Sequence, residues 1–184
     1  NLWTSQTDKV HSSADNIAAT LDRAFTFSAA DEPGESLLDH AFELTWQGYD
    51  SKLGGFEGAP KFPMPHRLLF LLRCYHRTAE AKALKMVEKT LKAMRLGGIW
   101  DHVGYGFHRY STDSQWLLPH FEKMLYDQAL IAQACLETYQ ITKNHFYAQI
   151  ADEIFSYVLR DMTSADGAFF SAEDADSEGE EGKF

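Results

Sequence analysis

Helical periodicity dominates the hydrophobic pattern of this chain, and the alternating pattern of strands is scarce. Six segments repeat apolar residues at helical spacing, four as a single stripe (12–28, 36–49, 79–95 and 145–162) and two on nearly every face (65–77 and 119–140). A striped helix keeps one wet face, whereas a helix that is apolar all round is covered on every side. From residue 36 onward the two kinds alternate, which predicts outer, striped helices around inner, buried ones.

The connections between these helices alternate in length as well. Inner-to-outer connections are short, near residue 78 and at 141–144, while outer-to-inner connections span 50–64, 96–118 and 163 onward. Because successive helices run in opposite directions, the three long loops are expected at one end of the helices. Long loops in compact domains are commonly binding loops. We therefore predict an all-α fold, a partial α/α toroid of alternating outer and inner helices, with a pocket where these loops meet.

Composition favours one globular domain over residues 1–184. The chain is 45% hydrophobic and 14% aromatic, which is enough for a sizeable core. Its first residue is Asn1 and its last residues form a loop, so we expect a piece of a longer protein.

The charge and the cysteines of the chain limit which binding partners and which cellular location are expected. The formal net charge is -10 and Lys and Arg form no basic patch, so nucleic acid is not an expected partner. No apolar stretch reaches the length that crosses a bilayer and no signal peptide is visible, so no membrane partner is expected. Cys74 and Cys135 lie in apolar runs without a CxxC motif, which predicts reduced core thiols and a cytoplasmic location.

The densest group of chemistry-bearing residues lies between residues 100 and 127. It contains Trp100, Asp101, His102, His108, Arg109, Tyr110, Trp116, His120, Glu122, Lys123 and Asp127. If the segment 119–140 is helical from its proline, His120, Lys123 and Asp127 share one face of its first two turns. Buried charges must be paired or must line a polar cavity. The group therefore predicts a ligand site, and the alternative is a salt-bridge network that pins the loop to the helix.

Two further loops add candidates. In the acidic stretch Glu173, Asp174 and Asp176 are expected to contribute carboxylates to the pocket, although a solvated loop or half of a calcium loop fits the pattern as well. In the loop 54–65, Glu57 and Lys61 are expected to bind ligand, since carboxylates beside aromatic rings are typical of sugar sites. The three histidines at 102, 108 and 120 match no compact zinc signature, so neither a metal nor another cofactor is expected.

Three segments resemble motifs of a known family. They are GGFEGAPKFP at 54–63, with Glu57 where Gly is more usual, the long segment 97–127 with GGIWDHVGYGFHRYSTD and PHFEKMLYD, and FSAEDADSEG at 170–179. Over residues 36–184 the chain resembles the thioredoxin-domain-containing proteins related to spermatogenesis-associated protein 20. The resemblance implies an (α/α)6 toroid similar to N-acylglucosamine 2-epimerases and six-hairpin glycosidases. It also implies a thioredoxin-like domain before the toroid, absent from this chain, as a partner.

Two functions remain open from the sequence. The first is an enzyme acting on a sugar or polyol. Epimerisation or isomerisation would use a histidine as general acid or base and two cations to orient the substrate, the candidates being His102, His108, His120, Arg109 and Lys123. Hydrolysis would use two carboxylates, Asp101 or Glu122 with Glu173 or Asp176. The second function is a non-catalytic binding or scaffold module that serves the thioredoxin-like domain.

Overall fold

The computed structural model describes residues 2–26, 34–56 and 58–182. The sequence predicts one domain over residues 1–184, whereas the structure has two compact units, residues 1–37 and 38–184. The first unit holds the helices α1 (Leu2–Ser5) and α2 (Thr7–Phe25), and α2 buries none of its residues. The predicted helix 12–28 corresponds to α2, and its residues 27 and 28 lie outside the described residues.

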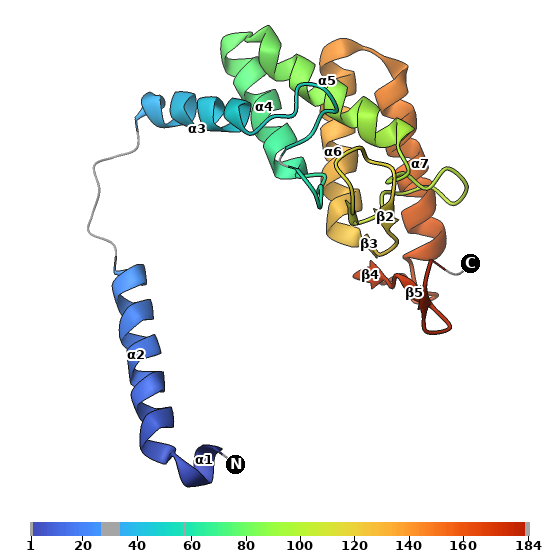
Figure 1. Ribbon diagram of the computed structural model, residues 1–184. Helices are drawn as coiled ribbons and strands as arrows, with labels where there is room; N and C mark the ends of the chain where they lie inside the picture. The colour runs from blue at the N-terminus through green and yellow to red at the C-terminus, as the bar shows by residue number, and fades with distance from the viewer. Residues whose placement is uncertain (1, 27–33, 57, 183–184) are drawn as a thin grey trace. The chain divides into compact units, whose positions relative to one another are not determined.

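The second unit is an array of helices in which two inner helices are flanked by outer ones. After α3 (Glu35–Gln47) come α4 (Pro65–Thr78), α5 (Ala81–Leu96), α6 (Leu125–Thr142) and α7 (His145–Asp161). The inner helices α4 and α6 pack against each other, α5 packs on α4, and α7 packs on α6 (Figure 1). The predicted alternation of outer and inner helices is therefore confirmed.

The burial of the helices follows their sequence patterns in part, since the striped helices α2 and α3 bury none of their residues. Helix α7 is capped by the side chain of Asn144, which accepts from the amide of Phe146, and it buries one stripe that includes Ile150 and Ile154. Helix α6, whose sequence predicts cover on every side, buries one broad face that includes Ile131 and Cys135 and leaves Tyr126 and Leu136 exposed on the opposite face. Each fully buried aliphatic side chain of this kind stabilises the fold by roughly 1.5–3 kcal/mol. The two cysteines are free and buried, and burial raises the pKa of both thiols, in keeping with reduced core thiols.

The second inner helix begins later than its sequence pattern predicts. Helix α6 starts at Leu125, and residues 119–124 are extended instead of helical. In the loops that the structure describes, six short strands pair: β1 (Tyr110–Ser111) with β2 (Pro119–His120), β3 (Lys123–Met124) with β4 (Ala172–Glu173), and β5 (Asp176–Ser177) with β6 (Glu180–Glu181), all antiparallel. Pairing with two separate loops holds the 119–124 segment extended, so tertiary hydrogen bonds override its local helical pattern.

The three long loops meet at one end of the helices, as predicted. Lys61 of the first loop pairs with Ser111 of the second through two backbone hydrogen bonds of 2.7 and 2.9 Å. The strand β3, which leads into α6, pairs with β4 of the third loop (Figure 1). No helix in the described part of the chain is both long and apolar enough to span a bilayer.

Candidate functional site

The first and second loops are joined by the side chain of Lys61, one of the predicted ligand-binding residues. Lys61 is fully buried, and its ammonium donates to the Asp50 carboxylate at 2.7 Å and to the carbonyl of Ser114 at 3.0 Å. Burial opposes ionisation of Asp50, but the hydrogen bonds from Lys61 and from two backbone amides lower its pKa. Lys61 is thus placed to hold the loops together. Glu57, its predicted neighbour in the site, lies outside the described residues.

Replacing Lys61 by methionine is expected to lower the free energy of unfolding by about 2 kcal/mol, because Asp50 and the Ser114 carbonyl lose their donor. Asp50 is partly exposed and keeps two amide donors, which limits the loss. Urea denaturation followed by circular dichroism measures it. The matched control is Lys52→Met in the same loop, where the lysine is exposed and a change within about 0.5 kcal/mol is expected. Equal values for the two variants would contradict the assignment.

Two tryptophans predicted to bind ligand are buried in the core. Trp100 and Trp116 are each 1% exposed. The ring of Trp116 lies directly over Gly55 with no room for a Cβ at that position, and its indole nitrogen donates to the Leu53 carbonyl at 3.1 Å. The Arg95 guanidinium lies 4.5 Å from the centre of the Trp100 ring. Both rings therefore belong to the core against which the loops pack, and neither is placed to stack on a ligand.

Residues 119–124 distribute their side chains to two separate clusters. The expectation that His120, Lys123 and Asp127 share one helical face is wrong, because His120 and Lys123 precede the helix on β2 and β3. Successive side chains of an extended segment point to opposite sides. His120 and Glu122 accordingly lie together on the side of Arg109, which pairs with Glu122. Phe121 contacts His108 and Lys123 contacts Asp101 on the other side.

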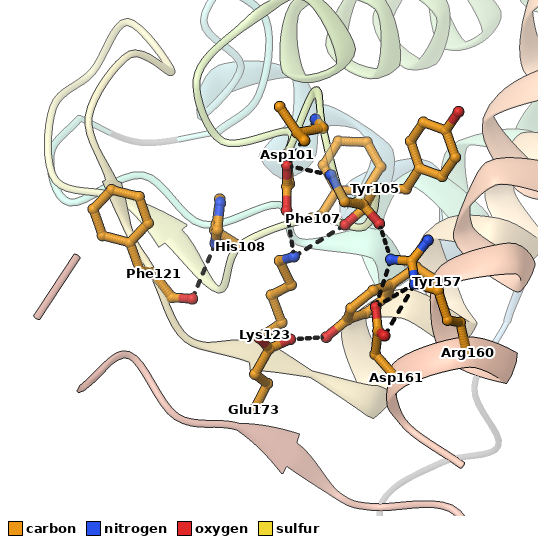
Figure 2. Close-up of polar contacts among 12 residues, drawn as sticks. Asp101, Tyr105, Phe107, His108, Phe121, Lys123, Tyr157, Arg160, Asp161 and Glu173 are labelled. Atoms are coloured by element: carbon orange, nitrogen blue, oxygen red, sulfur yellow. Dashed lines mark hydrogen bonds and ion pairs between the residues drawn. The ribbon is translucent and has the colours of Figure 1, made fainter. Parts of the chain in front are cut away.

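The first cluster, here called the lysine cluster, is Asp101, Tyr105, Lys123, Tyr157 and Glu173 (Figure 2). The Lys123 ammonium donates to Asp101 at 2.8 Å and to the Tyr105 carbonyl at 3.0 Å, and it lies 4.4 Å from the centre of the Tyr157 ring. Burial opposes ionisation of Asp101, but hydrogen bonds from Lys123 and two amides lower its pKa to about 2. The Tyr157 hydroxyl donates to Glu173, the cross-strand partner of Lys123. Each charged side chain of the lysine cluster therefore has a hydrogen-bond or ion-pair partner within the cluster.

His108 lies beside the lysine cluster and has one uncommitted nitrogen. Its side chain is 4% exposed, and its Nδ1 lies 3.0 Å from the carbonyl of Phe121 (Figure 2). A carbonyl only accepts, so Nδ1 carries the proton and Nε2 presents a lone pair. Burial and the neighbouring Lys123 lower the pKa of His108, which keeps the imidazole neutral. His108 also lines a cavity of about 430 Å³.

The second cluster, here called the arginine cluster, combines a histidine with carboxylates and an aromatic ring. It consists of Arg109, Tyr110, His120, Glu122, Tyr126, Asp127 and Glu181. His120 Nδ1 lies 2.6 Å from Glu181, its Nε2 lies 3.7 Å from Glu122, and Arg109 donates to Glu122 at 2.7 Å. The register of β1 and β2 sets Tyr110 opposite His120, and their rings stack 4.8 Å apart.

One buried atom of the arginine cluster, Nε of Arg109, lacks a hydrogen-bond partner among the described residues, as does the indole nitrogen of Trp100 in the core. The neighbouring Asp127 is largely buried, with 6% of the residue exposed. Burial raises the pKa of Asp127 from 3.8 to about 7, with Glu122 adding to the rise and Arg109 opposing it. Buried polar groups are nearly always satisfied in native proteins, and the exceptions concentrate where ligands bind. The arginine cluster is therefore the stronger candidate for a site.

The remaining predicted residues lie outside both clusters. His102 Nε2 lies 3.0 Å from the carbonyl of Gly97. Asp174 accepts from the amide of Asp176, and both side chains are in the exposed acidic loop. Within residues 2–26, 34–56 and 58–182, no three His, Cys, Asp or Glu side chains are grouped to hold a metal ion.

Sequence reasoning missed three polar partners of the predicted residues. Asp50 was not singled out, although it directly follows the helix before the glycine turn. Tyr157 reads as one more apolar position of the α7 stripe, and only its hydroxyl hints at a polar role. Glu181 stands in an acidic run without any distinguishing spacing, so the sequence offers no signal for its contact with His120.

The helices and loops define the class of this protein as an α/α toroid, and solved structures bear this out. A sugar epimerase from a ruminal bacterium superposes with a TM-score of 0.65 at 17% identity, over 74% of this chain and 38% of that chain. Cellobiose 2-epimerase from Bacillus thermoamylovorans gives 0.64 at 16% identity, over 76% and 40%. D-mannose isomerase gives 0.52 at 22% identity, over 65% and 30%. Likenesses at these identities show the fold.

In sequence the homologues are spermatogenesis-associated protein 20 of several animals. The Homo sapiens protein is 49% identical over 149 residues, which cover 79% of this chain and 19% of that protein. The Mus musculus protein is 47% identical over 165 residues, which cover 88% and 20%. The chain thus spans about a fifth of the length of the curated relatives it matches. No family model matches the chain.

Proposed function

We propose that the arginine cluster binds an open-chain sugar or polyol and catalyses its epimerisation or isomerisation by proton transfer. The observation that carries this proposal is the buried, unpartnered Nε of Arg109 beside the largely buried Asp127 carboxyl, next to a histidine held between two carboxylates. The solved structures of similar fold named as sugar epimerases and a mannose isomerase support the choice of substrate class.

The proposed chemistry needs only groups that the cluster contains. A base removes the proton from the carbon next to the substrate carbonyl, which gives an enediolate, and an acid returns a proton to the opposite face of that carbon or to its neighbour. His120 is the proposed acid or base, since it is hydrogen-bonded and partly exposed. Arg109 stabilises the negative oxygen. The rings of Tyr110 and Phe62, 4.8 Å apart, offer an apolar surface to sugar C–H groups.

Hydrolysis is less well supported by the same geometry. Of the carboxylates predicted for it, Asp101 is neutralised by Lys123 and Glu173 accepts from Tyr157. Glu122 belongs to the arginine cluster and is paired with Arg109. Asp176 lies in the acidic loop and pairs by its backbone with Glu181. Proton transfer by His120 is therefore the better proposal. The thioredoxin-like partner domain and the cytoplasmic location stay predictions.

The test is exchange of substrate protons with solvent. Purified protein is incubated in D₂O with cellobiose, mannose, glucose and fructose, and loss of the C2 proton or its equivalent is followed by NMR. His120→Gln is expected to lower the rate at least a hundredfold, the usual contribution of a general acid or base. His145→Gln, an exposed histidine outside the cluster, is the matched control and should keep the rate. If none of these sugars exchanges or binds, the proposal fails and a non-catalytic role is favoured.

A further inference from the structure

A cavity on the other side of the 119–124 segment stands apart from the arginine cluster. It measures about 430 Å³ and is lined by Asp101, Val103, Gly104, His108 and Phe121. None of these residues belongs to the arginine cluster. A cavity of this size accommodates a molecule of about one ring.

One polar atom at this cavity, Nε2 of His108, has no hydrogen-bond partner among the described residues. Nδ1 of His108 is held by the Phe121 carbonyl, and no described residue is hydrogen-bonded to Nε2, on a side chain that is 96% buried. The Asp101 carboxylate accepts from Lys123 and from the amides of Val103 and Gly104, so its oxygens are already occupied. Figure 2 shows these contacts, with the second nitrogen of His108 left outside them. The cavity thus presents a buried acceptor among apolar walls.

This chemistry selects among ligands. An anion would need a free cation, and the Lys123 ammonium is used by Asp101, by the Tyr105 carbonyl and by the Tyr157 ring. A molecule without an O–H or N–H donor leaves the buried Nε2 unsatisfied, which weakens its binding. The ring of Phe121 and the side chain of Val103 offer apolar contact. The complement is an uncharged molecule with a hydroxyl on an apolar body.

We propose that this cavity is a binding site for a small uncharged hydroxyl compound, which donates its hydroxyl to Nε2 of His108 and packs its body against Phe121. The site is separate from the proposed sugar site. It requires neutral imidazole, because protonated His108 has no acceptor.

A matched pair of probes tests this proposal. Phenol has the donor and anisole has nearly the same shape without it. Two-dimensional ¹H–¹⁵N spectra of the histidine rings follow titration with each. Phenol is expected to shift the His108 resonances and to bind at least tenfold more tightly than anisole, and benzoate should not compete.

Two variants make the outcome decisive. Val103 is 93% exposed at the cavity, so Val103→Trp is expected to fill the cavity without disturbing the fold and to abolish phenol binding. His120→Gln should leave phenol binding unchanged, so failure of the sugar site and failure of this site are distinguishable. Equal affinities for phenol and anisole, or binding that persists in Val103→Trp, would overturn the proposal.

Discussion

Replacing Trp116 by alanine is expected to lower the free energy of unfolding by about 4 kcal/mol, within the range for buried tryptophans. Trp116 is 1% exposed, lies over Gly55 and donates to the carbonyl of Leu53. Its removal leaves a cavity between the first and second loops and an unpaired carbonyl. Because the Lys61 ammonium lies 5.2 Å from the centre of the Trp116 ring, the two residues are expected to be energetically coupled.

The adjacent residue supplies the control. Leu117 is 60% exposed, so Leu117→Ala should change stability by no more than about 0.5 kcal/mol. Urea denaturation at several probe wavelengths measures both variants and tests two-state behaviour. A loss below about 1 kcal/mol for Trp116→Ala would mean that the loops keep their arrangement without it.

The helices were predictable because their apolar residues obey a period that tertiary contacts reinforce. Pro65 fixes the start of α4, and Asn144 caps α7. The alternation of striped and more broadly apolar segments carried information about layers, since α4 and α6, which bury Leu68 and Ile131, lie inside, and α5 and α7 pack on them. The spacing of apolar residues along the chain was therefore enough to predict how the helices of the second unit are arranged.

The site was predictable in content but not in arrangement. The segment that begins at Pro119 has helical apolar spacing, yet β1 and β4 hydrogen-bond to it and keep it extended. These pairings join residues about 10 and 50 positions apart, and local periodicity holds no information about such contacts. A helix would have gathered His120 with Lys123, whereas the extended segment separates them into two clusters. Trp100 and Trp116 illustrate the same limit, because aromatic content alone does not distinguish a supporting ring from a stacking platform.

Asp127→Asn is expected to stabilise the protein at neutral and alkaline pH. In the folded state burial raises the pKa of Asp127 from 3.8 to about 7. Between these values the folded protein binds more protons at this carboxyl than the unfolded chain does, so stability falls as the pH rises from about 4 to about 7. The total loss is about 2–4 kcal/mol. Asparagine has a similar shape and no charge, and its variant should lack this slope and exceed the parent by that amount at pH 8.

Denaturation in urea at pH 5 and pH 8 checks the expectation, with Asp152→Asn, an exposed carboxylate on α7, as the control that should alter neither value appreciably. A variant no more stable than the parent at pH 8 would show that Arg109 holds Asp127 ionised at no cost. The same variant informs function, because a residue retained at the expense of stability is expected where activity needs it. Asp127→Asn should therefore gain stability while losing sugar binding or turnover, a combination that a purely structural carboxyl would not produce.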